Sequence, residues 1–320
     1  MYKLLTIAKN TFTETLRQPI YSVIIVAALF LFFISPSLTM YTMSDDSKLL
    51  REIGLSTLFL TSLFIAIFSA SGAVGEEIEN KTIVTVLSKP VSRPIFIIAK
   101  FLGVSGAVIL AHYICTIALL MSIRHGVLET VNDTHDWTVL GSAGVVIGLS
   151  FLLSAFLNFT YGWKFSSTAI ITGSILATFA LVFLCFIDRT WHFNPEYNGI
   201  NTFDVYAAVL LLLAAILIVA IAVALSTRFN IVVTLSACIG IFLLGLVNDY
   251  VFGRLAAEHW WGNIGRYLIP NLQVFWISDA IYEANEVPLK YILISASYAI
   301  CYTVGILSLA VALFQRRQVG

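Results

Sequence analysis

Long apolar stretches, separated by short polar segments, make up most of the chain. Eight of these stretches approach or exceed the roughly 20 residues with which a helix crosses a hydrocarbon core of about 30 Å. Within that core, a helix satisfies its backbone hydrogen-bonding groups internally. The stretches are 20–40, 53–74, 95–123, 137–159, 166–187, 205–226, 231–247 and 291–314. The pattern predicts an all-α protein, a polytopic bundle of about eight spanning helices in one transmembrane domain, residues 1–320.

The first nineteen residues have the pattern of an amphipathic helix. Its apolar face consists of Leu4, Leu5, Ala8, Phe12 and Leu16. Charged and polar residues occupy the remaining surface, so we expect an interfacial helix over 1–19 that lies on the inner leaflet until Pro19 breaks it. A cytoplasmic extension of the first spanning helix stays open as the alternative.

Composition narrows the class of protein. Hydrophobic residues make up 59% of the chain and charged residues only 11%, against about 25% charged in an average soluble domain. Basic and acidic residues both number 18, so no positive excess favours nucleic acid. The four cysteines lie in apolar stretches without metal or disulfide spacing, and we interpret them as core residues. We therefore expect an integral membrane protein that does not bind nucleic acid.

The distribution of cations predicts the orientation in the membrane, because Lys and Arg are retained on the cytoplasmic side of short loops. A cytoplasmic N-terminus places eleven of the 18 cations on cytoplasmic segments. These are Lys3, Lys9, Arg17, Lys81, Lys89, Arg93, Lys100, Lys164, Arg228, Arg316 and Arg317. Both termini are then expected in the cytoplasm.

An aromatic segment, residues 250–290, precedes the last spanning stretch on the predicted outer side. Its rings include Tyr250, Phe252, Trp260, Trp261, Tyr267, Phe275, Trp276 and Tyr282. Aromatic rings with a polar edge prefer the headgroup level, so we expect short helices that dip into the outer leaflet. Two interpretations stay open, a lid or exit gate and an interfacial belt that only anchors the protein.

Motifs for catalysis are absent from the sequence. It contains no phosphate-binding loop GxxxxGK[ST], zinc motif HExxH or nucleophile elbow GxSxG, and its five histidines are scattered. We therefore expect no catalytic residue, metal site or cofactor in this chain, and no enzymatic activity of its own. His112, inside the third stretch, is interpreted as a neutral, hydrogen-bonded side chain. Asp188, Arg189 and Asp249 are expected to be solvated residues at helix ends.

The segment between the second and third spanning stretches carries the most specific pattern. Residues 76–103 read EEIENKTIVTVLSKPVSRPIFIIAKFLG. Acids open the segment, where they complement the positive end of a helix dipole, and Lys89 stands near the other end. Pro90 disfavours continuation of the helix. The pattern predicts a short cytoplasmic helix in the segment 76–94, parallel to the membrane, that carries a partner's motion into the bilayer.

This run resembles the first cytoplasmic loop of ABC exporter permeases of the second type. There a coupling helix follows an acidic patch and precedes a Leu-Ser-Lys/Arg-Pro-Val/Ile-Ser/Thr-Arg run and a Lys-x-x-Gly. The matching positions here are Glu76, Glu77, Glu79, Asn80, Thr82, Leu87, Ser88, Lys89, Pro90, Val91, Ser92, Arg93, Lys100 and Gly103. Residues 13–21, 268–281 and 314–317 are similar to the same family. The family core has six spanning helices, so the eight stretches imply one additional hairpin.

The resemblance implies a permease subunit in the bacterial inner membrane. It pairs with a second permease copy or a related permease, and cytoplasmic ABC ATPase subunits hold ATP and Mg. The residues expected to couple to the ATPase are Glu76, Glu77, Glu79, Thr82, Val86, Leu87, Lys89, Pro90 and Arg93. A mechanotransmission or assembly component without substrate transport stays open as the alternative. The sequence does not identify a substrate.

Overall fold

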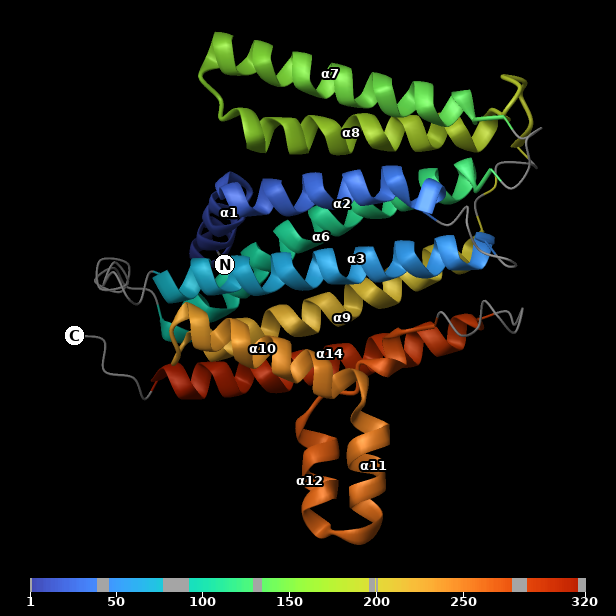
Figure 1. Cartoon of the computed structure of the whole chain (residues 1–320). Helices are drawn as coiled ribbons and strands as arrows, with labels where there is room; N and C mark the ends of the chain where they lie inside the picture. Colours follow the sequence, from blue (N-terminus) through green and yellow to red (C-terminus); the bar gives the residue numbers. More distant parts are fainter. Residues whose placement is uncertain are drawn as a thin grey trace. The chain divides into compact units, whose positions relative to one another are not determined.

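The computed structural model describes residues 2–38, 46–76, 92–128, 134–195, 199, 201–277 and 287–315 (Figure 1). Within these ranges all regular secondary structure is helical, and an isolated bridge pairs Ile187 with Phe193. The prediction of an all-α, polytopic helical fold is confirmed.

Seven of the described helices are long and apolar enough to cross a membrane. They are α2 (Pro19–Leu38), α3 (Asp46–Ala70) with the π-helical turn η2 (Ser71–Glu76), α6 (Arg93–His125), α7 (Trp137–Tyr161), α8 (Phe165–Phe186), α9 (Thr202–Ser226) and α14 (Leu289–Gln315). They coincide with seven of the eight predicted stretches, and the chain is an integral membrane protein.

The remaining stretch, 231–247, forms a bent element. Helix α10 (Ile231–Leu246) meets α11 (Asn248–Glu258) at an angle of 74°. Beside the bend, a Cβ added to Gly245 would lie 2.8 Å from the carbonyl oxygen of Pro270. The Asn248 side-chain amide donates to the carbonyl of Ile269 at 2.6 Å. The chain that returns from α12 therefore packs directly on the bend. If α10 and α11 count as one broken span, the described residues contain eight candidate spans.

Local side-chain chemistry sets several helix ends. The Asp136 carboxylate accepts hydrogen bonds from the backbone N–H groups of Thr138 and Val139, as an N-cap does. Gly162 ends α7 in the left-handed conformation, with φ of 68°, which a glycine adopts without strain. The Asn230 side chain caps α10 in the same way as Asp136 caps α7. Short turns thus separate α7 from α8 and α9 from α10.

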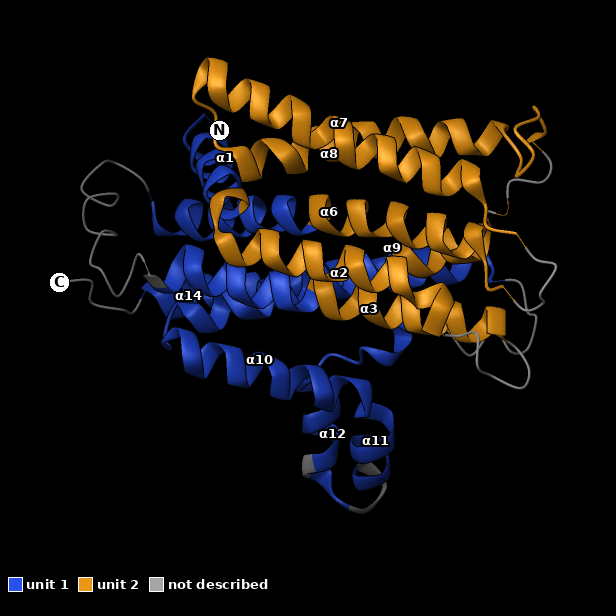
Figure 2. Cartoon of the chain, turned by 45° about the horizontal axis from the view of Figure 1, so that its top comes forward, with its two compact units in different colours: residues 1–15, 63–108, 209–320 blue, residues 16–62, 109–208 orange. Residues whose placement is uncertain are grey.

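The chain divides into two compact units (Figure 2). Unit 1 comprises residues 1–15, 63–108 and 209–320, and unit 2 comprises residues 16–62 and 109–208. Helices α1 (Tyr2–Arg17), α3, α6 and α9 contribute residues to both units. The single transmembrane domain expected over 1–320 stays a prediction.

In unit 2, α7 and α8 lie side by side (Figures 1 and 2). One buried cluster joins α6, α7 and α8 through Ile117, Met121, Val139, Ala177 and Leu184. Helix α2 is tied to α6 by hydrogen bonds, because the hydroxyl of Ser122 donates to the carbonyl of Phe32 and lies 3.0 Å from the hydroxyl of Ser35.

In unit 1, α11 forms a hairpin with α12 (Trp260–Leu268), and the short helix η4 (Gln273–Phe275) follows (Figure 1). Short helices are therefore present in the described part of the aromatic segment 250–290, and their placement in the outer leaflet stays a prediction. Tyrosines of α14 hold this segment. The hydroxyl of Tyr302 donates to the carbonyl of Leu268 at 2.6 Å, and that of Tyr291 donates to the carbonyl of Val274 at 2.6 Å.

Candidate functional site

The predicted coupling residues lie mostly outside the described part of the chain. Those outside it are Glu77, Glu79, Thr82, Val86, Leu87, Lys89 and Pro90. Glu76 is the last residue of η2, and Arg93 is the first residue of α6. The structure therefore describes the two flanks of the segment 76–94, and it is these flanks that form the candidate site.

Arg93 joins the downstream flank to the end of another spanning helix. Its guanidinium donates to the carbonyl oxygens of Phe314 and Gln315 at 3.3 and 2.6 Å. The same group lies 5.8 Å from the centre of the Phe314 ring. The last carbonyls of a helix have no partner within the helix and form the negative end of its dipole. A guanidinium at this place satisfies two of them.

A second arginine reaches the same helix end. Arg228, in the turn between α9 and α10, donates to the carbonyl oxygen of Leu313 at 2.6 Å. The beginning of α6, the α9–α10 turn and the end of α14 therefore meet at one place in unit 1. The charge distribution of the sequence predicts these three segments on the cytoplasmic side, and that orientation stays a prediction.

The residues that follow Arg93 along one face of α6 extend its contact with the end of α14. Phe96 is fully buried and stacks on Phe314, with ring centres 5.8 Å apart and an interplanar angle of 21°. Lys100 is 2% exposed, and its amine lies 5.8 Å from the centre of the Phe96 ring. The spacing of Arg93, Phe96 and Lys100 follows the period of a helix, so the three side chains share one face.

Gly103 continues this spacing and meets α1 (Tyr2–Arg17). A Cβ at position 103 would lie 2.6 Å from the carbonyl oxygen of Ala8 and 2.6 Å from the Cβ of Thr11. The glycine therefore lets the backbone of α1 approach α6 closely. In this structure, the two positions that match the family's Lys-x-x-Gly are a buried lysine, Lys100, and a glycine at a helix crossing, Gly103.

Helix α1 has the predicted extent and a slightly different buried face. Thr11 and Thr15 are each 1% exposed, whereas Leu5 of the predicted apolar face is 62% exposed. The helix ends at Arg17 and α2 begins at Pro19. The two elements are therefore separate helices, and the placement of α1 on the inner leaflet stays a prediction.

The upstream flank is also packed. The π-helical turn η2 continues α3 and contacts α10. Local π-helical turns recur at functional sites, where an extra residue re-aims the helix. Both flanks of the segment 76–94 are therefore anchored on spanning helices of unit 1, so a force on the segment would act on α3, α6, α10 and α14.

Unit 2 contains a buried ionic cluster that the sequence did not indicate. Arg124 and Asp136 have side chains only 3% and 0% exposed and approach to 3.5 Å. The guanidinium of Arg124 also donates to the carbonyl oxygens of Leu184 and Ile187 at the end of α8. Arg189 reaches the same Asp136 carboxylate at 3.6 Å. These contacts fix the ends of α6, α7 and α8, and we interpret the cluster as structural.

Two of the residues that the sequence predicted to be solvated, Arg189 and Asp249, are partly exposed to solvent. The Arg189 side chain is 57% exposed and that of Asp249 is 47% exposed. The pKa of Asp188 is lowered, mainly because the Thr190 hydroxyl donates to its carboxylate and then because the His192 backbone N–H does so.

His112 forms the hydrogen bonds that the sequence predicted. Its Nδ1 lies 2.7 Å from the hydroxyl of Ser62, and its Nε2 lies 2.9 Å from the carbonyl oxygen of Ala208. The carbonyl can only accept, so Nε2 carries the proton and Nδ1 accepts from Ser62 in the neutral ring. Across the described residues, no three His, Cys, Asp or Glu side chains are grouped as a metal site requires. Through its hydrogen bonds to Ser62 and Ala208, His112 of α6 links α3 and α9.

Comparison with known proteins adds no relative. No protein-family model matches the chain, and no curated protein matches it either.

Proposed function

We propose that this chain is the membrane-spanning permease subunit of an ATP-driven ABC exporter. In this proposal it pairs with a second permease copy, and separate cytoplasmic ATPase subunits supply the energy. The observation that carries the proposal is the ordered run 76–103. It resembles the coupling loop of the second exporter type, and at its described end Arg93 contacts α14 and Gly103 lies against α1.

The absence of a phosphate-binding loop from the sequence supports the division of labour. A chain without this loop needs a partner to hydrolyse ATP. In the proposed mechanism, closure of the ATPase subunits pushes on the segment 76–94. Arg93 then passes the displacement to α14 through the carbonyls of Phe314 and Gln315. The shift between inward-open and outward-open states is limited by the difference in nucleotide affinity between those states.

Reconstitution tests the proposal. The purified chain alone should hydrolyse no ATP, and hydrolysis should appear when a nucleotide-binding subunit is purified with it. Vesicles that contain the complex should then accumulate a labelled substrate when ATP is added outside. ATPase stimulation without transport of any tested substrate would favour the mechanotransmission alternative. Hydrolysis by the homogeneous chain would contradict the division of labour.

A further inference from the structure

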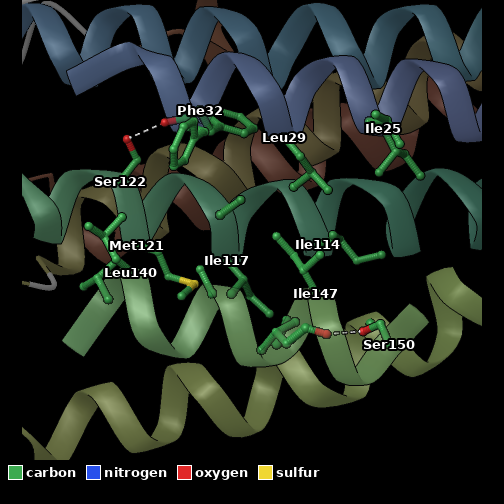
Figure 3. A pocket seen from close by; sticks show the side chains of 18 of the residues that line it. Ile25, Leu29, Phe32, Ile114, Ile117, Met121, Ser122, Leu140, Ile147 and Ser150 are labelled. Atoms are coloured by element: carbon green, nitrogen blue, oxygen red, sulfur yellow. Dashed lines mark hydrogen bonds between the residues drawn. The ribbon is translucent and has the colours of Figure 1, made fainter. Parts of the chain in front are cut away.

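A large apolar cavity lies within unit 2, between α2 and α6 on one side and α7 and α8 on the other (Figure 3). Its volume is about 530 Å³, and it is partly open at the surface of the unit. Most of its wall is aliphatic or aromatic, with Leu29, Ile117, Met121 and Ile147 among the residues that project into it. The volume falls in the 300–1,000 Å³ range of ordinary ligand pockets.

Two of the hydroxyl groups in the wall already have hydrogen-bond partners within their own unit. Ser122 donates to the carbonyl of Phe32, and Ser150 donates to the carbonyl of Val146 at 2.6 Å. A buried water needs two to four polar partners, and an apolar wall does not supply them. An empty cavity of this size would forfeit dispersion contacts along its whole lining. An apolar occupant therefore fits the wall better than water or a void.

The shape restricts this occupant further. The lining on α2 extends from Ser22 to Ser37, which at 1.5 Å per residue is a length of about 22 Å. A volume of 530 Å³ open to the centres of water molecules, spread over that length, corresponds to a mean width of about 8 Å between the lining atoms. A helix with its side chains is 10–12 Å wide and does not fit. The length exceeds the depth of one leaflet, which is about half of a 30 Å hydrocarbon core.

One end of the cavity is polar. His125, the last residue of α6, and His135, just before α7, both line this end. Nε2 of His125 lies 3.3 Å from Nδ1 of His135. Helix ends of spanning segments lie near the headgroup level, so the polar group of an amphiphile at this end would meet ring nitrogens and water.

We propose that this cavity binds one membrane phospholipid, with a hydrocarbon chain between α2, α6, α7 and α8 and its headgroup at the His125–His135 end. The proposal does not rest on the proposed function, because the cavity lies within unit 2 and involves none of the residues expected to contact an ATPase. The bound lipid would complete the packing of the α7–α8 hairpin against α2 and α6.

The test uses the full chain in vesicles of equal parts phosphatidylethanolamine and phosphatidylglycerol, with a trace of phospholipid that carries a diazirine in its acyl chain. The protein is extracted and washed in detergent, which removes loosely held lipid, and retained phospholipid is counted by native mass spectrometry. Irradiation of a second sample then maps the labelled residues. Two variants fill the cavity from different helices, Ala118→Phe on α6 and Ala143→Phe on α7. The control is Ala155→Phe, the same change at an exposed position of α7.

We expect one retained phospholipid per chain in the wild-type protein and in Ala155→Phe, and at least tenfold lower occupancy in both filling variants. Crosslinks should fall on cavity residues such as Leu29, Met121 and Ile147. The proposal is overturned if the washed wild-type protein retains no phospholipid, or if the filling variants retain as much as the control. Should neither filling variant insert, the wild-type crosslinks decide, and labels confined to outward residues such as Phe156 and Phe159 would refute the site.

Discussion

The guanidinium of Arg93 donates a 2.6 Å hydrogen bond to the carbonyl oxygen of Gln315, which joins the first residue of α6 to the last residue of α14. These residues are 222 positions apart in the chain. Arg93 is also the last of the residues that are expected to couple this chain to an ATPase. The contact therefore gives the segment 76–94 a fixed attachment to a second spanning helix.

Removal of this contact should destabilise unit 1. Arg93→Ala leaves two carbonyls at the end of α14 without their charged donor, and we expect a loss of about 1–2 kcal/mol. Arg93→Lys keeps a charged donor but loses the planar guanidinium that lies beside the Phe314 ring, so the melting temperature of Arg93→Lys should lie between those of Arg93→Ala and the wild-type protein. The measurement is thermal unfolding in detergent, with Arg254→Ala, an exposed arginine of α11, as the control. Identical melting temperatures for Arg93→Ala and the control would contradict the anchoring role.

The crossing of α1 and α6 should depend on the absence of a side chain at Gly103. In Gly103→Ala the new Cβ meets the backbone oxygen of Ala8, which cannot rotate away, and overpacking of this kind costs about 1–3 kcal/mol. Gly305→Ala is the matched control, because its Cβ would meet nothing within 4 Å and the change favours a helix by up to about 1 kcal/mol. Thermal unfolding should show opposite shifts for the two variants. A stabilising effect at both positions would show that the close approach is absent.

The apolar pattern predicted the helical fold and most helix ends, because each spanning helix needs a continuous apolar run and polar residues interrupt these runs at the turns. The bend after Leu246 was not predicted. It depends on the returning residues 270–272, which pack against Gly245 from a distant part of the sequence. The helical spacing of Phe96 and Lys100 places them on one face, but the close approach of Gly103 to Ala8 of α1 could not be predicted from the sequence.

The ionic cluster of unit 2 escaped sequence analysis for a similar reason. Asp136 is separated from Arg189 by more than fifty residues, and only the packing of α6, α7 and α8 brings their side chains together. The predicted apolar face of α1 included Leu5, which is exposed, whereas the structure buries Thr11. Tertiary contacts, rather than local hydropathy, decide such positions.

The charge of Asp136 should be essential to the stability of unit 2. Asp136→Asn preserves the N-cap of α7 but leaves Arg124 buried without its counter-ion, so we expect a loss of about 3–5 kcal/mol. Asp249→Asn makes the same change in an exposed pair with Arg266 and should cost no more than about 1 kcal/mol. Unfolding by denaturant in detergent compares the two. Equal losses would contradict the assignment of a buried structural charge.

The predicted orientation can be tested at two exposed positions on either side of α6. With Cys115, Cys185, Cys238 and Cys301 replaced, single cysteines are introduced by Ser92→Cys and Thr134→Cys. An impermeant thiol reagent should label position 134 in intact cells and position 92 only after the membrane is opened, because the cation distribution places residue 92 in the cytoplasm. The reverse labelling pattern would invert the predicted topology.

The proposed function requires the segment 76–94 to couple this membrane chain to an ATPase. Val86 and Leu87, which lie outside the described residues, are expected on the apolar face of the coupling helix. Burial of one such side chain contributes about 1.5–3 kcal/mol, so Val86→Asp with Leu87→Asp should weaken the complex by at least about 100-fold. Insertion and expression should stay unchanged, because the segment is outside the hydrocarbon core.

Co-purification of the ATPase with the tagged chain, quantified together with ATP hydrolysis, is the most direct measurement. The double variant is compared with Thr134→Asp, a polar change at an exposed position on the predicted outer side. The proposed function predicts that Thr134→Asp retains both the ATPase and its hydrolysis, whereas the double variant inserts normally and loses both. Equal retention of the ATPase and equal hydrolysis in the two variants would contradict the coupling role of this segment.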